Sequence, residues 1–123
     1  DPLARYNNAV SKGRQEMADR HHVYFNPFSD IEEGNPQMIL ERKEPVELPP
    51  LLVMQGGLDD NVLPAFQVKF GEAYRAAGGA CEVAVFEGCG HLWVLEPGPD
   101  TDRAHEMLKA FIARQLHAPP QAA

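Results

Sequence analysis

Apolar and polar positions in the second half of the chain form two strand-like runs and a helix-like stripe. Residues 51–55 (LLVMQ) are an uncharged apolar run, which predicts a strand buried on both faces. Residues 81–86 (CEVAVF) predict a second strand. Between them, apolar side chains recur at helical spacing from Pro64 to the pair Gly78-Gly79, which predicts an amphipathic helix. Its apolar positions are Phe66, Phe70, Ala73, Tyr74 and Ala77.

A second helix-like stripe follows a long loop, residues 87–99, which contains three glycines and two prolines. Thr101 is a suitable N-cap for this last helix. The order strand, helix, strand, helix predicts an α/β protein in which two parallel strands are joined by a crossover helix. The apolar face of the last helix carries Ala104, Met107, Leu108, Phe111 and Ile112.

The beginning of the chain is polar and favours a helix. Asp1-Pro2 places an N-cap acceptor before a proline at the first helical position, so a helix is expected from residue 3 to about residue 17. Gly13 is the weak point of this helix. The following aromatic segment, residues 21–28, is expected to be irregular.

Two short helical segments and a surface connection are expected before the first strand. Ser29-Asp30-Ile31-Glu32 has the pattern of a capping box, and Gly34 is a suitable end for that helix. Asn35-Pro36 repeats the combination of a cap and a proline. Residues 41–50 are charged and contain several prolines, which predicts a surface connection.

We therefore divide the chain into three parts. Residues 1–50 are a helical and loop segment, either cap-like or a connection between strands. Residues 51–117 are an α/β unit, and residues 118–123 are a tail. A length of 123 residues is ordinary for a single domain, and a 44% share of hydrophobic residues is enough to form a core.

Charge and cysteine content narrow the classes of partner. The formal net charge is −7, so the surface repels a phosphate backbone and nucleic acid is not expected as a partner. No apolar run approaches the roughly 20 residues of a membrane span. Cys81 and Cys89 lie at opposite ends of the second predicted strand, about 15 Å or more apart, so we expect free thiols. Free thiols favour a reducing, cytoplasmic location.

Two polar loops follow the two predicted strands. Residues 56–62 (GGLDDNV) contain the neighbours Asp59 and Asp60, and residues 88–93 (GCGHLW) contain His91. Because parallel strands end at the same edge of a sheet, a carboxylate from the first loop can meet the imidazole of the second. A carboxylate that orients a histidine is half of a system for activating a nucleophile.

At these loops the resemblance to a family becomes specific. LLVMQGGLDDNVLP is similar to the acid-bearing strand and loop of α/β-hydrolases, in which Gly-x-x-Asp-x-x-Val precedes a proline and a helix. EGCGHLW resembles their histidine loop, and AYRAAGG the end of the helix between the two. DPLARY and EEGNPQMIL resemble the region between nucleophile and acid in esterase and lipase-like members. The chain thus resembles the C-terminal part of a serine α/β-hydrolase, with acid before histidine as in the order Ser…Asp…His.

The resemblance implies roles for two residues. The catalytic acid falls on Asp59, three residues after Gly56, and the catalytic base on His91; Asp60 is the adjacent alternative for the acid. It implies hydrolysis of a small carboxylic ester by a Ser-His-Asp triad, with no cofactor and no metal.

The chain departs from the family in its serines. Gly-x-Ser-x-Gly, the motif of the nucleophile, is missing, and the only serines are Ser11 and Ser29. We therefore expect the chain to be inactive alone. Its expected partner is the N-terminal part of the same hydrolase, which carries the serine. The alternative is a non-catalytic, truncated or proteolysed fragment that folds by self-association as an oligomer.

Other reactive residues favour simpler interpretations. His21-His22 lack spaced metal-binding partners, and Cys89 is too close to His91 in sequence to aim at it. Trp93 is suited either to lining an acyl pocket or to packing on the last helix. A phospho-acceptor receiver domain with a Mg²⁺ pocket would need five strand–helix units, and only two strands are predicted here.

Overall fold

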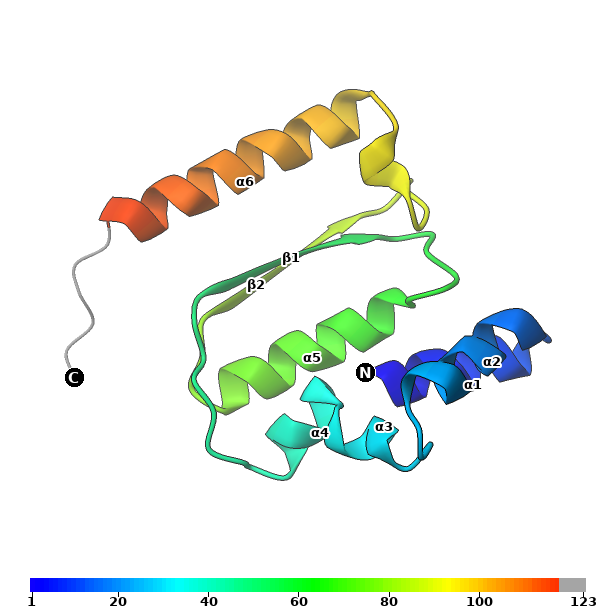
Figure 1. The fold of residues 1–123 in the computed structure, drawn as a ribbon. Coiled ribbons are helices and arrows are strands. Elements are labelled where there is room, and N and C mark those ends of the chain that lie inside the picture. Colours follow the sequence, from blue (N-terminus) through cyan, green and yellow to red (C-terminus); the bar gives the residue numbers. More distant parts are fainter. Residues whose placement is uncertain (118–123) are drawn as a thin grey trace.

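A small parallel sheet between two helices forms the centre of the structure. The computed structural model describes residues 1–117. Strands β1 (Leu51–Gly56) and β2 (Cys81–Phe86) are joined by helix α5 (Pro64–Ala76), which covers one face of the sheet. Helix α6 (Pro99–His117) covers the other face (Figure 1). The predicted α/β class and its order of elements are confirmed.

Four shorter helices precede the sheet and lie on its α5 side (Figure 1). They are α1 (Pro2–Ser11), α2 (Gln15–Tyr24), α3 (Asp30–Glu33) and α4 (Pro36–Glu41). A short 3₁₀ turn, η1 (Trp93–Leu95), lies in the loop between β2 and α6. The predicted boundary at residue 50 remains a prediction, and the predicted tail, residues 118–123, lies outside the described residues.

The core lies mainly between the sheet and α6. Phe86 is 1% exposed and contacts Ala104 of α6, with Met54 and Met107 packed beside them. Trp93 stacks on the Phe86 ring at 4.4 Å between ring centroids. Trp93 therefore has the packing role, which was one of the two predicted alternatives.

Helix α5 approaches the opposite face of the sheet closely. A Cβ atom built on Gly71 would lie 2.6 Å from Cγ2 of Val83, so this helix can sit at its observed distance because it carries a glycine there. The hydroxyl of Tyr74 donates to the carbonyl of Pro49, which ties the end of the helix to the chain entering β1.

Strand β1 is less buried than its sequence predicts. Its first four residues are half-buried, whereas a strand with two covered faces and two neighbours would be buried throughout. Within residues 1–117 the sheet has two strands, so β1 pairs with β2 alone and its other edge has no strand. The open edge accounts for the partial exposure.

The first half differs from its prediction at two places. Gly13, with φ +68°, divides the single predicted helix into α1 and α2. Residues 21–24 are helical rather than irregular, because the aromatic side chains in this region pack against α1. Tyr6 contacts the rings of both His21 and His22, and the latter stacks on Phe28.

Two of the four predicted N-caps form and two do not. Asp1 accepts from the backbone N–H of Ala4 at 3.0 Å, and Asn35 caps α4. Ser29 makes no side-chain cap, so the predicted capping box is wrong. Thr101 lies inside α6, and its hydroxyl donates to the Glu96 carbonyl at 2.6 Å, which holds the helix to the preceding loop.

Candidate active site

The loop after β1 holds the Asp59 carboxylate in a fixed orientation. Oδ1 of Asp59 accepts the backbone N–H groups of Asn61 and Val62, each at 2.9 Å. Gln55, buried at the end of the strand, donates to the Val62 carbonyl at 2.8 Å and braces the same loop. With Oδ1 occupied by the backbone, Oδ2 is turned outward, towards the second loop.

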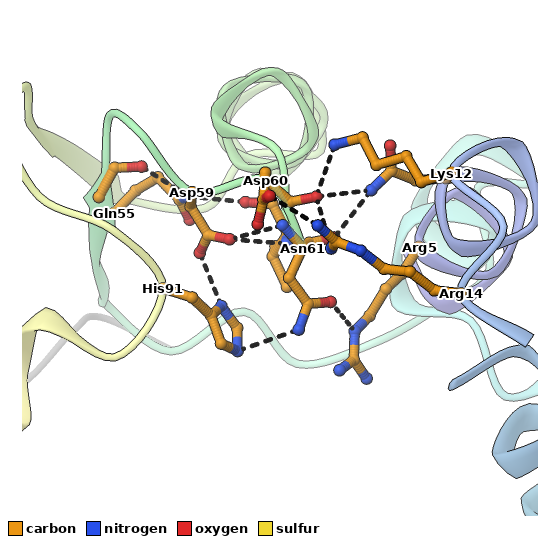
Figure 2. Close-up of polar contacts among 11 residues, drawn as sticks. Arg5, Lys12, Arg14, Gln55, Asp59, Asp60, Asn61 and His91 are labelled. Carbon is orange, nitrogen blue, oxygen red and sulfur yellow. Dashed lines mark hydrogen bonds and ion pairs between the residues drawn. The ribbon is translucent and has the colours of Figure 1, made fainter. Parts of the chain in front are cut away.

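The loop after β2 is held against the first loop by backbone contacts. The N–H of Leu58 donates to the Cys89 carbonyl at 2.9 Å, and the N–H of Gly57 donates to the Phe86 carbonyl at 2.8 Å. These bonds bring His91 beside Asp59, with Nδ1 of the imidazole 2.8 Å from Oδ2 of the carboxylate (Figure 2). The sequence placed both residues at one edge of the sheet, and the structure brings them into contact.

The Asp59 carboxylate is charged at neutral pH although it is buried. Burial raises the pKa of Asp59, but hydrogen bonds from His91, Asn61 and Val62 outweigh burial and leave the pKa below its ordinary value. An ionised carboxylate only accepts hydrogen bonds, so Nδ1 of His91 carries the proton. The lone pair of Nε2 is then available as a base, on a side chain that is 36% exposed.

Asp60 faces the other way. Its carboxylate binds Nη2 of Arg14 at 2.6 Å on the surface, and its carbonyl accepts from Nζ of Lys12 at 2.8 Å (Figure 2). The hydrogen bond from Arg14 lowers the pKa of Asp60. Asp60 therefore anchors α1 and its following loop, and the pairing with His91 is made by Asp59.

Sequence reasoning did not identify two further residues of the site, Asn61, which contacts the imidazole, and Arg5, which contacts Asn61. Nδ2 of Asn61 lies 3.3 Å from Nε2 of His91, and Oδ1 of Asn61 accepts from Nε of Arg5 at 2.9 Å (Figure 2). Asn61 lies two residues after Asp59 in the sequence, and this closeness could have indicated that it belongs to the site. Arg5 carried no such signal, because 56 residues separate it from Asn61.

A cavity adjoins this site on the side of α1 and α2. Its volume is about 370 Å³. Arg5 lines the cavity and also donates a hydrogen bond to Asn61. The other lining residues are Pro2, Arg20, His21, Tyr24 and Phe25. The cavity lining is therefore largely apolar and aromatic, and Arg5 connects it to Asn61 of the histidine site.

The remaining reactive residues have structural surroundings. Both cysteines are free, as predicted, and both are buried; Sγ of Cys89 lies 3.4 Å from Oδ2 of Asp100. Burial, with the Asp100 carboxylate beside it, raises the pKa of the Cys89 thiol. Across residues 1–117, no group of three or more His, Cys, Asp or Glu side chains could hold a metal ion. In the same range no helix is long and apolar enough to cross a membrane.

The parallel strands, the crossover helix and the acid–histidine pair at the strand ends define part of an α/β-hydrolase. The sequence profile of the prolyl oligopeptidase family matches residues 6–118. The chain belongs to the prolyl oligopeptidase family.

Two solved structures of a thermophilic esterase from the planctomycete Thermogutta terrifontis are similar to the chain. The native form has 27% sequence identity and a TM-score of 0.52, and the butyrate-bound form has 27% identity and a TM-score of 0.50. Each match covers 63% of this chain and 29% of the esterase chain. Comparison with curated protein sequences gave no match. The family and the esterase likeness together support a serine hydrolase-like function.

Proposed function

We propose that the chain supplies the acid, Asp59, and the general base, His91, of a Ser-His-Asp triad that hydrolyses carboxylic esters. The observation that carries the proposal is the contact of 2.8 Å between Nδ1 of His91 and Oδ2 of Asp59, which leaves the lone pair of Nε2 to act as the base.

The chemistry follows from this geometry. Nε2 of His91 takes the proton of a serine hydroxyl as its oxygen attacks the acyl carbon of the ester. The imidazolium that forms lies against the Asp59 carboxylate, whose negative charge stabilises it. The proton then passes to the leaving alcohol, and water repeats the sequence on the acyl-enzyme.

The serine comes, in this proposal, from the N-terminal part of the same hydrolase. The open edge of β1 offers a site where a further strand can pair. Leu58 and Leu92, the neighbours of Asp59 and His91, are 67% and 62% exposed, so two large apolar side chains beside the pair are uncovered in this chain. A serine-bearing part that docks there would cover both features and bring its hydroxyl to Nε2.

Small esters are the favoured substrates. The esterase likeness supports them, and the apolar cavity beside Arg5 is suited to a short acyl or alcohol group. A peptide bond is the second candidate, which the name of the family supports. The attack on the acyl carbon is the same for both.

The test is to purify the natural protein, identify any second polypeptide by intact mass, and measure hydrolysis of p-nitrophenyl butyrate and of a prolyl peptide anilide. We expect ester hydrolysis to depend on His91, so that His91→Ala abolishes it while His105→Ala, on the exposed face of α6, does not. Hydrolysis of the peptide anilide without hydrolysis of the ester would favour the peptidase alternative. Activity that survives His91→Ala would refute both.

A non-catalytic fragment that folds by self-association is the remaining alternative. It predicts that the natural protein contains only this chain, in a dimer or larger assembly, and that no serine-directed phosphonate probe labels it.

A further inference from the structure

Four side chains form a continuous hydrogen-bonded series through the candidate site. Arg5 donates from Nε to Oδ1 of Asn61 at 2.9 Å, and Nδ2 of Asn61 lies 3.3 Å from Nε2 of His91. The series ends at Asp59, 2.8 Å from Nδ1 of the same imidazole (Figure 2). The side-chain amide of Asn61 thus contacts Nε2, the nitrogen that a serine hydroxyl would have to reach.

The chemistry of the two ends fixes the direction of every bond. A guanidinium only donates, so the Asn61 oxygen must face Arg5 and its NH₂ group must face His91. Nε2 of His91 must then accept. From the other end, the Asp59 carboxylate only accepts, so Nδ1 must donate. Both ends require the same imidazole tautomer, with the proton on Nδ1, and it is the tautomer that a general base needs.

Arg5 is itself held by the helix that carries it. Helix α1 and the loop after it are anchored to the acid loop through the Asp60 carbonyl, which accepts from Nδ2 of Asn8 at 2.9 Å and from Nζ of Lys12 at 2.8 Å. The first segment of the chain is therefore hydrogen-bonded to the acid loop at several points, although it contributes no group to the triad.

On the basis of the proposed function, we propose that Asn61, oriented by Arg5, is a positioning residue that stands in for the serine hydroxyl. It keeps the proton of His91 on Nδ1 and the Nε2 lone pair aimed at the place of the nucleophile, and it yields that place when the serine arrives. A separation of 3.3 Å is long for a hydrogen bond. A nucleophilic hydroxyl and its base lie within about 2.6–3.2 Å, so exchange favours the serine.

A purely structural role for Asn61 predicts a different order of variants. Aspartate has nearly the shape of asparagine, so a structural role would make Asn61→Asp milder than Asn61→Ala. In our proposal the order is reversed. A carboxylate at this position accepts from both Arg5 and His91, so it draws the imidazole proton to Nε2, while alanine only removes the constraint.

The first test is the tautomer of His91 in the 123-residue chain, in whatever assembly it adopts, read from ¹⁵N shifts of labelled imidazoles at about pH 8.5, where a free imidazole is neutral. His91→Gln assigns the signal among the five histidines. We expect the Nδ1–H tautomer in the wild type, the Nε2–H or doubly protonated form in Asn61→Asp, and a mixture in Asn61→Ala and Arg5→Met.

Two controls match these variants. Asn7→Ala changes an exposed asparagine of α1, and Arg20→Met changes the other arginine of the cavity, whose partner is Glu16 at 2.5 Å. Both should leave the His91 signal unchanged. An Nε2–H signal in the wild type, or an Asn61→Asp signal like the wild type, would overturn the proposal.

The second test separates the positioning role from the triad itself. In the enzyme assembled with its serine, we expect kcat to fall roughly 10-fold further in Asn61→Asp than in Asn61→Ala, because a misplaced proton disables the base. If activity depends on His91 but Asn61→Asp is milder than Asn61→Ala, the inference about Asn61 fails and the proposed function stands. If no assembly hydrolyses esters, the proposed function fails, and the tautomer measurement alone decides whether Asn61 sets the proton on His91.

Discussion

Asp59 and Asp60 show how strongly position separates two identical side chains. Asp59 is 7% exposed and bonded to backbone N–H groups and to His91, whereas Asp60 lies on the surface against Arg14. The two residues are neighbours, yet the loop turns one inward and the other outward. A mutational comparison of the pair therefore tests the site with little change in composition.

We predict that Asp59→Asn in the assembled enzyme lowers kcat by about 10³–10⁴-fold, because an amide at this position no longer fixes the imidazole tautomer. Asp60→Asn should change kcat only a few-fold, because it weakens an exposed ion pair. Steady-state kinetics on an ester substrate measures both. If Asp60→Asn lowered kcat strongly and Asp59→Asn lowered it only slightly, our assignment of the acid would be wrong.

The pKa of Asp59 gives a prediction for stability against pH. The folded-state pKa is lowered, so the charged carboxylate stabilises the fold at pH values above its ordinary pKa of about 3.9. This contribution is lost as the pH falls through the lowered value. We expect the free energy of unfolding of the wild type to exceed that of Asp59→Asn at pH 7, and the difference to shrink below about pH 4.

Chemical denaturation at each pH, in about 1 M salt, measures this difference. High salt screens the exposed pair of Asp60 with Arg14, whose carboxyl also has a lowered pKa, more than it screens the buried Asp59. A difference that stays constant from pH 7 to pH 3 would contradict the linkage.

At the scale of elements, the site depends on how closely the two loops approach. A Cβ atom on Gly56 would lie 2.5 Å from the Cys89 carbonyl oxygen and would also collide with the carbonyl of Gly90. Both obstacles are backbone atoms, which cannot rotate away. The glycine at the end of β1 is thus needed because the histidine loop passes directly over it.

Gly56→Ala should separate the loops and misplace His91 relative to Asp59. We expect a loss of about 1–3 kcal/mol in stability from the steric conflict, and roughly a 100-fold loss in kcat/KM from a displacement of the order of 1 Å. Gly90→Ala is the matched control, since a Cβ there meets no atom within 4 Å. Equal behaviour of the two variants would show that the close approach does not position the site.

At the scale of the whole molecule, the core is small for the length of the chain. Within residues 1–117 the buried hydrophobic side chains include only three large ones, Ile31, Tyr74 and Phe86. Apolar residues at helical spacing along α6, Leu108, Ile112 and Leu116, are 40%, 47% and 76% exposed. Within the described residues, β1 and β2 each have an outer edge with no neighbouring strand, and a two-stranded parallel sheet of this kind is only marginally stable by itself.

We therefore predict that the purified 123-residue chain is not a stable monomer. Each backbone group that becomes buried without a partner costs about 1–3 kcal/mol, against a total stability of about 5–15 kcal/mol. Sedimentation at micromolar concentration should find a self-associated assembly or an unfolded chain. A species of 13.6 kDa that unfolds cooperatively would disprove the prediction.

The sequence by itself determined the parts of this protein that local patterns encode. The apolar runs of β1 and β2, the stripe of α5 and the cap of α1 follow from periodicity and single residues, and the order of strands and loops placed Asp59 and His91 at one edge. Tertiary structure decided what depends on packing between distant segments. It extended α2 through residues 21–24 by packing aromatic rings against α1. It also brought Arg5 to Asn61 across 56 residues. Such contacts are set by how helices and loops dock in space, for which spacing along the chain holds no signal.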